Sequence, residues 1–253
     1  LRPADHPRTP DRGDGAFRVS VLDILSGGAA QGLVASLAPT FKARTGLDIT
    51  GEFGAVGAMA GKLRDGVSAD LLVLTAAVIA ELARENLVVG ASITDIGLVE
   101  TAIAVRSGDP LVSVHDASAL RAALLAADAI FVPDMTASTA GIHVAKILRQ
   151  LGIADEVAAR LNIFPNGATA MRHLAASDAN RPIGCTQSTE IISTSGVKLS
   201  GPLPPGCELS TMYTAAVASA AADPGHAKDL IELLSGADQD EFRRRAGFIG
   251  GGR

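Results

Sequence analysis

Residues 17–53 read FRVSVLDILSGGAAQGLVASLAPTFKARTGLDITGEF, and this stretch decides the fold class. Its first part, residues 17–25, is rich in apolar and β-branched residues and predicts a strand. Residues 29–45 carry apolar side chains three to four positions apart, which predicts a helix that ends at Gly46. Residues 47–53 predict a second strand. Strand, helix and strand in this order are typical of a parallel β-α-β unit in an α/β protein.

The same alternation continues to the end of the chain. We expect further strands at residues 69–74, 98–105, 129–132, 181–186 and 210–219. We expect further helices at residues 58–64, 76–85, 117–125, 141–151, 154–161, 169–176, 224–234 and 238–245. The Pro/Gly-rich residues 201–206 predict a linker.

This order of elements predicts two α/β lobes, each a mainly parallel sheet flanked by helices, joined by a hinge of two crossing strands. We expect lobe 1 to contain residues 17–99 and 207–253, and lobe 2 to contain residues 100–206. Residues 1–16 hold charges and prolines with little to bury, which predicts a flexible leader. Because the chain starts at Leu1 rather than Met, we expect that a signal peptide has been removed.

The composition argues against several classes of protein. The 253 residues carry a net charge of −5, only 3% of them are aromatic and no Lys/Arg-rich run occurs, so we do not expect a nucleic-acid partner. We expect no membrane insertion, since no apolar run reaches about 18 residues. The histidines lack metal-ligand spacing and no cofactor-binding motif occurs, so we expect neither a metal nor a cofactor. Cys185 and Cys207 could be two buried free thiols or a disulfide.

Four turns join a strand to a helix through small or hydroxyl residues. They are Ser26-Gly27-Gly28, Val56-Gly57-Ala58, Ser138-Thr139-Ala140-Gly141 and Gly167-Ala168-Thr169. The first N–H groups of a helix lack intrahelical partners, and the helix dipole adds positive charge there. Small side chains let an anion approach these N–H groups. The four turns therefore predict a cleft that binds an oxyanion or carboxylate without Lys or Arg, and Thr136 adds a further hydroxyl.

Three side chains near this predicted cleft are candidate general bases if the protein is an enzyme: His143, Glu190 and Asp134. Each also has an ordinary structural interpretation. His143 could be a half-exposed helical residue, and the two carboxylates could be solvated or could cap a turn.

Several segments resemble the periplasmic molybdate-binding protein family of ABC importers, which are type II periplasmic solute-binding proteins. They are LDILSGGAAQGLVASLAPTFKARTGLDI, FGAVGAMAGKLRDGVSADLLVLT, TAGIHVAKILRQLG, RPIGCTQSTE and FRRRAGF, and they span residues 22–248. The resemblance implies a two-lobed fold that closes over a small anionic ligand, a molybdate-like oxyanion or a di- or tricarboxylate. It also implies an ABC permease as partner, a periplasmic location and a monomer.

Carried over to this chain, the family's binding pattern places a ligand-binding Ser at Ser26, two amide donors at Ala140 and Thr169, and a ligand-binding Tyr at Gln187. The family's Ser-rich turn is replaced here by residues 54–58, GAVGA, which have no hydroxyl. Tyr213 lies in the return strand, and we do not expect it in the site. Unpaired ligand oxygens are costly in a closed cleft, so the changed donors favour a larger ligand with carboxylates or several oxygens.

Some proteins similar to this family are aconitate isomerases, which act on small unsaturated tricarboxylates. This similarity implies an alternative function, in which a proton moves along an allylic system and the C=C bond shifts. Such a reaction needs a base near the substrate carbon and donors for the enolate-like charge. Capture of an anion for an ABC importer remains the first hypothesis, and isomerisation is the alternative.

Overall fold

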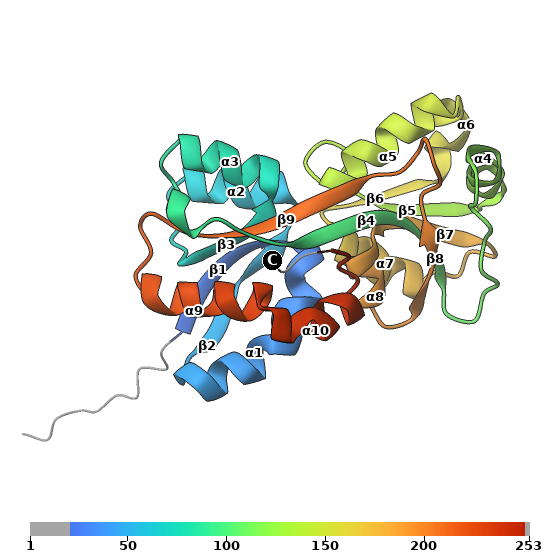
Figure 1. Ribbon diagram of the computed structural model, residues 1–253. Helices are drawn as coiled ribbons and strands as arrows, with labels where there is room; N and C mark the ends of the chain where they lie inside the picture. Colours follow the sequence, from blue (N-terminus) through green and yellow to red (C-terminus); the bar gives the residue numbers. More distant parts are fainter. Residues whose placement is uncertain (1–20, 251–253) are drawn as a thin grey trace, which may run out of the picture.

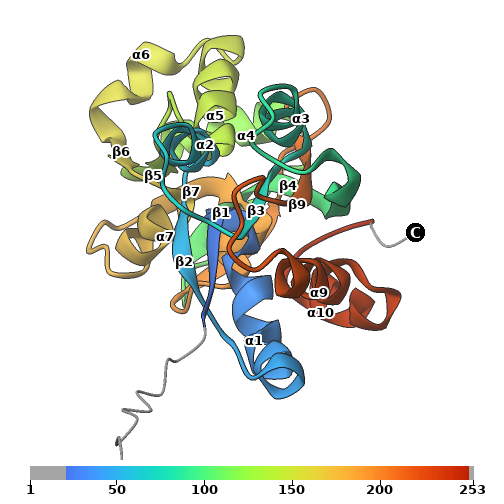
Figure 2. The same ribbon diagram turned by 90° about the vertical axis from the view of Figure 1, so that its left-hand side faces the viewer.

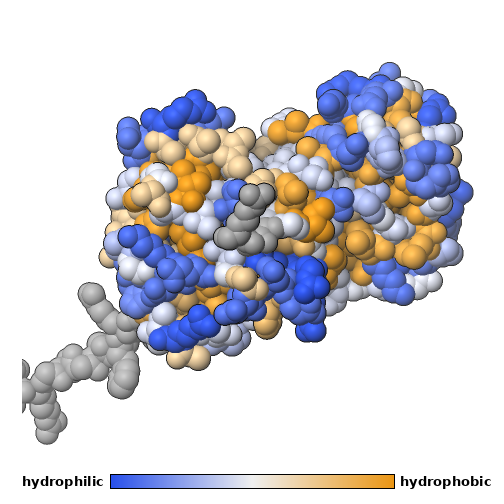
Figure 3. Space-filling model, in the orientation of Figure 1, coloured by the Kyte–Doolittle hydropathy of each residue, from blue (hydrophilic) through white to orange (hydrophobic). Residues whose placement is uncertain are grey.

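The computed structural model describes residues 21–250. The predicted leader, residues 1–16, and the start of the first predicted strand lie outside this part of the chain. The strands follow one path in the order β2-β1-β3-β9-β4-β7-β5-β6, with β8 beside β4. Helices pack on the strands in two groups, so that the molecule has two lobes with a notch between them (Figures 1 and 3). The predicted two-lobed α/β architecture is confirmed.

Lobe 1 is built on the β-α-β pattern predicted from residues 17–53. Strand β1 (Val21–Gly27) pairs in parallel with β2 (Asp48–Gly54) and with β3 (Leu71–Thr75). Its helices are η1 (Gly28–Ala30, one 3-10 turn), α1 (Gln31–Thr45), α2 (Val56–Arg64) and α3 (Ala76–Arg84). Helix α1 ends as predicted, because Gly46 takes a left-handed φ of 78° and its N–H donates to the carbonyl of Lys42.

Lobe 2 repeats the arrangement with β5 (Ala129–Pro133) between β6 (Leu161–Phe164) and β7 (Pro182–Gln187), all parallel. Its helices are α4 (Ala117–Ala126), α5 (Thr139–Gln150), α6 (Ala154–Val157), η3 (Ala158–Arg160), α7 (Gly167–Ala175) and α8 (Ser188–Ile192). Cys185 and Cys207 are both buried free thiols, and burial raises the pKa of Cys185 to about 12.

Two segments carry the chain between the lobes. Strand β4 (Thr94–Arg106), which follows η2 (Gly90–Ser92), belongs to both lobes. Its first half pairs with β9 (Ser210–Val217), and its second half pairs with β7 and β8 (Val197–Pro202). Figure 1 shows β4 and β9 running side by side from one lobe to the other. The chain returns between β8 and β9, where Thr101 exchanges backbone hydrogen bonds with Leu203 and Leu209.

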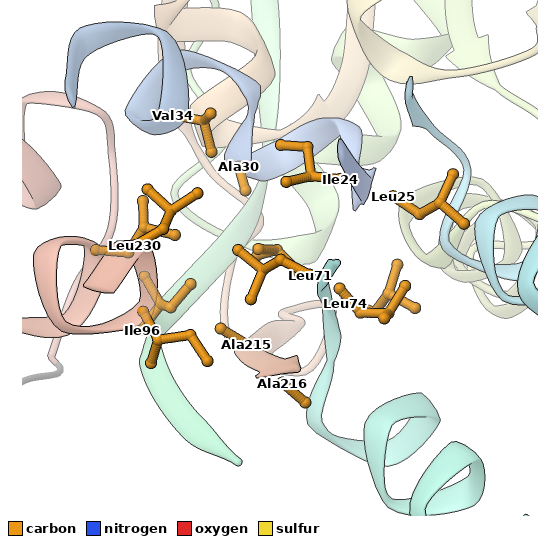
Figure 4. Close-up of a cluster of buried hydrophobic side chains, with 14 of the residues drawn as sticks. Ile24, Leu25, Ala30, Val34, Leu71, Leu74, Ile96, Ala215, Ala216 and Leu230 are labelled. Atoms are coloured by element: carbon orange, nitrogen blue, oxygen red, sulfur yellow. The ribbon is translucent and has the colours of Figure 1, made fainter. Parts of the chain in front are cut away.

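The last helices complete lobe 1. Helix α9 (Pro224–Ser235) packs against α1, β4 and β9, and η4 (Ala237–Gln239) and α10 (Asp240–Arg245) follow it (Figure 2). The core of this lobe brings Leu230 of α9 together with Leu71 of β3 and Ala215 of β9 (Figure 4). Burial of one such leucine side chain contributes about 1.5–3 kcal/mol. Aliphatic residues supply this core, as the low aromatic content of the chain requires.

Four elements of lobe 2 differ from the prediction: the helix at residues 154–161 and the elements β6, α8 and β8. The predicted helix at residues 154–161 is wrong at its end, because Leu161 is already the first residue of β6. Strand β6 lies at the edge of the sheet and is half exposed, so it lacks the apolar run by which a buried strand is predicted. Helix α8 and strand β8 were not predicted. Strand β8 pairs only with β4 and ends at Pro202, within the predicted linker, as an edge strand permits.

Candidate functional site

A small, partly open cavity lies between the lobes, where helices of both lobes begin. The empty space here is about 240 Å³ when the part open to solvent is included. The lining comes from η1, the end of β2 and the start of α2, the starts of α5, α7 and α8, and the middle of β9. The lining residues are Gly28, Gly54, Ala55, Val56, Ser138, Thr139, Ala140, Asn166, Gln187, Glu190 and Tyr213.

Two helices present free N–H groups to this cavity. Helix α2 begins after Ala55 and α5 begins after Ser138, and no described side chain caps either start. Ala55 has no polar side-chain atom, and the Ser138 hydroxyl does not bond to its own helix. The N–H groups of Val56 in α2 and of Thr139 and Ala140 in α5 are therefore available to an anion, whereas the N–H of Gly57 donates to the carbonyl of Ala137. The dipoles of the two helices favour an anion at these positions.

Gln187, at the end of β7, is the clearest sign of a ligand. Its side chain lines the cavity and is only 3% exposed. Within residues 21–250, neither its amide nitrogen nor its amide oxygen has a hydrogen-bond partner. A buried polar atom without a partner costs about 1–3 kcal/mol. A ligand with both acceptor and donor atoms would remove this cost.

Glu190 brings a carboxylate into the same cavity. The residue is 5% exposed, and the Thr186 hydroxyl donates to Glu190 Oε2 at 2.5 Å. Burial raises the pKa of the Glu190 carboxyl. Hydrogen bonds from the Thr186 hydroxyl and from the N–H groups of Ala168, Gln187 and Gly167 oppose this rise. A buried carboxyl group whose pKa is raised is a candidate general base.

Tyr213 also lines the cavity, and the expectation that it lies outside the site is wrong. Strand β9 runs back beside β3, so that Tyr213 pairs with Thr75 and its ring packs against Gly27. Burial and the nearby charge of Glu190 raise the pKa of the Tyr213 phenol, which keeps its hydroxyl neutral. A neutral phenol can donate a hydrogen bond to an anion.

The structure brings seven of the predicted site residues to the cavity wall: Gly28, Val56, Ser138, Thr139, Ala140, Gln187 and Glu190. Two others lie directly behind this wall. The Ser26 hydroxyl donates to the carbonyls of Gly27 and Val73, and Gly27 lies against Tyr213 and Val56. Ser26 therefore supports the backbone of the first turn and does not line the cavity.

Four more predicted binding residues lie away from the cavity wall. Ala58 is exposed, and the N–H of Gly57 donates to the carbonyl of Ala137 across the notch between the lobes. The Thr136 hydroxyl donates to Asp134. The N–H of Thr169 donates to Asn166 Oδ1 at 2.8 Å, because Asn166 caps α7. The Thr169 amide is therefore already satisfied within the protein.

Two of the three predicted bases do not reach the cavity wall either. His143 Nε2 lies 2.8 Å from the carbonyl oxygen of Cys207. Asp134 accepts hydrogen bonds from the Thr136 hydroxyl and from the N–H groups of Thr136 and Ala137, which lower its pKa. A carboxylate stabilised in this way is a weak base. Glu190 alone of the three predicted bases lines the cavity.

Four residues of the wall are not among the predicted site residues: Gly54 and Ala55, in the turn before α2, and Asn166 and Tyr213. Asn166 follows Pro165 and precedes α7, and this N-cap signal is visible in the sequence. Tyr213 lies in an otherwise ordinary strand, and only the pairing of β9 with β3 places it at the site.

The described part of the chain contains no cluster of three or more His, Cys, Asp or Glu residues that could hold a metal ion. No helix between residues 21 and 250 has the length and apolar character to span a bilayer.

Comparison with known proteins agrees with this architecture. Residues 22–249 match the model of the family described as bacterial extracellular solute-binding protein. An aconitate isomerase of Pseudomonas sp is 26% identical over 230 residues, which cover 87% of this chain and 84% of that protein. The periplasmic molybdate-binding protein of Azotobacter vinelandii superposes with a TM-score of 0.76 at 16% identity, covering 90% of this chain and 99% of that one.

A third similar protein is the sulfate-binding protein SubI of Mycobacterium tuberculosis. It superposes with a TM-score of 0.70 at 18% identity, covering 90% of this chain and 86% of that one. Two lobes joined by crossing strands, with helix starts around a cavity between them, form the fold of these solute-binding proteins. The chain belongs to the bacterial extracellular solute-binding protein family.

Proposed function

We propose that this protein captures a small anion that carries carboxylate groups, acting in the periplasm as a monomeric receptor for an ABC importer. The observation that carries the proposal is the buried amide of Gln187, which lines the cavity and has no hydrogen-bond partner among residues 21–250 for either polar atom. The free N–H groups at the starts of α2 and α5 would hold the negative charge, and Gln187 would bind a second group of the ligand.

The family and the oxyanion-binding names of the similar structures support an anionic ligand. The chemistry of the wall favours carboxylates within that class. The turn that begins α2 contributes glycine and alanine and no hydroxyl, whereas Gln187 and Tyr213 offer donors suited to a ligand with several separated oxygens.

The test is a binding screen by thermal shift and calorimetry with citrate, cis-aconitate, trans-aconitate, molybdate, tungstate and sulfate. We expect carboxylates to stabilise the protein, and Gln187→Leu to weaken their binding at least about tenfold, because the variant removes two hydrogen bonds. Gln150 is exposed on α5, and Gln150→Leu is the matched control. Binding of the oxyanions alone would contradict the proposal.

A second candidate function is isomerisation of a small unsaturated tricarboxylate. Glu190, a buried carboxyl with a raised pKa in the cavity wall, favours it, and the isomerase relative agrees. Glu190 would remove a proton from the methylene carbon and return it to the former vinylic carbon, so that the C=C bond moves by one position. The amides at the helix starts would stabilise the enolate-like charge.

Ultraviolet absorbance of cis- and trans-aconitate separates the two functions. An isomerase converts one isomer into the other with catalytic amounts of protein, and Glu190→Gln should abolish turnover while leaving binding measurable. Absence of turnover on either isomer would remove the isomerase hypothesis and leave capture in place.

A further inference from the structure

Glu190 contacts both lobes inside the cavity. A Cβ atom built on Gly28 of η1 would lie 2.4 Å from Glu190 Oε1, and one on Gly167 of α7 would lie 1.9 Å from Oε2. The carboxylate therefore fills the space between the first turn of lobe 1 and a helix start of lobe 2. Oε2 is bonded to Thr186, whereas Oε1 faces Gly28, which itself lines the cavity.

The cavity offers this carboxylate no cation. Among the described residues that line it, Glu190 and Tyr213 alone can ionise. The other elements packed against α8 carry charged side chains that are exposed or half-buried and do not line the cavity. These residues are Lys42 and Arg44 on α1, Asp95, Glu100 and Arg106 on β4, Arg172 and His173 on α7, and Lys198 on β8.

An ionised carboxylate only accepts hydrogen bonds, and so does an ionised ligand oxygen. Two such oxygens in contact in a buried, cation-free site repel each other, so one proton must lie between them. That proton can come from a hydroxyl group of the ligand. For a ligand without a hydroxyl it must come from a protonated carboxyl group, either that of Glu190 or one of the ligand's own.

We propose that Glu190 and the bound anion share one proton, so that the site selects small acids carrying a hydroxyl group over acids and oxyanions that only accept hydrogen bonds. This inference rests on the proposed capture of a carboxylate-bearing anion. The raised pKa of the Glu190 carboxyl agrees with this proposal, because a buried carboxyl group keeps its proton to a higher pH than a carboxyl group in water. The buried amide of Gln187, which has no hydrogen-bond partner in the described part of the chain, independently indicates a polar ligand in the same cavity.

The test uses pairs of acids that differ by one hydroxyl group: citrate against tricarballylate, and malate against succinate. Dissociation constants are measured by calorimetry from about pH 6 to about pH 9. In the wild-type protein the preference for the hydroxy acid should grow with pH, by up to about tenfold per pH unit above the pKa of Glu190. The reason is that the acid without a hydroxyl group binds only when Glu190 is protonated, whereas the hydroxy acid also binds when Glu190 is ionised. The ratio of the two dissociation constants within a pair is compared at each pH, because the ionisation of the ligands' own carboxyl groups largely cancels in it.

Three variants sharpen the test. Glu190→Gln replaces the carboxyl by an amide that both donates and accepts, so the preference should become independent of pH and sulfate should bind at least about tenfold more tightly at alkaline pH. Thr186→Val keeps the carboxyl but removes a donor to its ionised form, so the preference should begin to grow at a higher pH. Glu232→Gln, at an exposed position on α9, should behave as the wild type.

The outcomes separate the two claims. Equal affinity for both members of each pair at every pH would overturn the role of Glu190 and leave carboxylate capture intact. A pH-dependent preference that persists unchanged in Glu190→Gln would also overturn it. Binding of sulfate or molybdate with no carboxylate bound at any pH would overturn the proposed function, and with it this inference.

Discussion

At the scale of single residues, two glycines create the space that the Glu190 carboxylate occupies. Gly28 and Gly167 do not take positive φ, so their backbones could accommodate other residues. Their restriction is steric, since any Cβ atom there would overlap the oxygens of Glu190. The side-chain size at two positions in different lobes therefore determines whether the carboxyl group can lie in the cavity wall.

We expect Gly167→Ala to lower the free energy of unfolding by about 1–3 kcal/mol, because the added methyl group overpacks a buried site. Gly61 lies within α2 with no atom near its would-be Cβ. Gly61→Ala should therefore raise the free energy of unfolding by about 0.5–1 kcal/mol through helix propensity. Urea denaturation of the two variants measures both values. Similar effects of the two substitutions would show that Glu190 does not need this space.

The pH dependence of stability follows from the raised pKa of Glu190. Between its ordinary pKa and the raised one, the folded protein holds a proton that the unfolded chain has released. The free energy of unfolding therefore contains a contribution from Glu190 that is lost as pH rises through the raised pKa. We expect Glu190→Gln to flatten this decline, and melting temperatures measured against pH would reveal it. Parallel curves for wild type and variant would contradict the assigned direction.

Only some of the residues that line the cavity can be predicted from the sequence. The small-residue turns indicate where helices begin, so Gly28, Ser138 and Ala140 could be predicted from chemistry alone. Gln187 could be predicted only through resemblance to a family. Tyr213 could not, because its place at the cavity depends on β9 returning antiparallel to β3, a pairing between segments 138 residues apart along the chain (75 to 213).

At the scale of elements, the helices and strands of lobe 1 follow closely from apolar periodicity, whereas lobe 2 contains the errors. Strands β1 and β3 are buried and apolar, and α1 has a glycine stop. Strands β6 and β8 lie at edges, where exposure removes the apolar pattern that marks a strand. Apolar periodicity reflects burial. It therefore predicts the helices and strands that form the core and fails to predict strands at the edge of a sheet.

The start of α7 allows its stability and its binding role to be separated. Asn166 accepts from the N–H of Thr169 and lines the cavity, whereas Asp116 accepts from the N–H of Ala119 at the start of α4, away from it. Loss of either cap should lower the free energy of unfolding by about 1 kcal/mol. We expect Asn166→Ala to change ligand affinity as well, and Asp116→Ala to leave it as in the wild type. Calorimetry measures the ligand affinity of both variants. Equal affinities in the two variants would contradict a binding role for Asn166.

At the scale of the whole molecule, the lobes are joined by crossing strands on one side of the cavity and touch on the other. The N–H of Gly57, in the first turn of α2, donates to the carbonyl of Ala137 in lobe 2 at 3.4 Å. This weak hydrogen bond lies at the start of a helix that lines the cavity, and α8 of lobe 2 also packs against η1 and α1 of lobe 1. We expect a ligand to enter where Gly57 separates from Ala137, while β4 and β9 keep the lobes connected.

A disulfide between these two positions should trap the closed state. A Cβ atom on Gly57 would lie 3.9 Å from the Cα of Ala137, which is close enough for paired cysteines. We expect the oxidised Gly57→Cys, Ala137→Cys variant to exchange ligand at least about a hundredfold more slowly than its reduced form, since entry requires this contact to open. Cys185 and Cys207 are buried and should not compete for the new thiols.

Each single-cysteine variant serves as the control for this experiment. Ligand release followed by fluorescence or by exchange of labelled ligand, before and after reduction, measures the effect. Oxidation before loading should exclude ligand, and oxidation after loading should retain it. Unchanged exchange in the fully oxidised variant would mean that ligand reaches the cavity by another route, past the crossing strands, and that the lobes need not separate at Gly57.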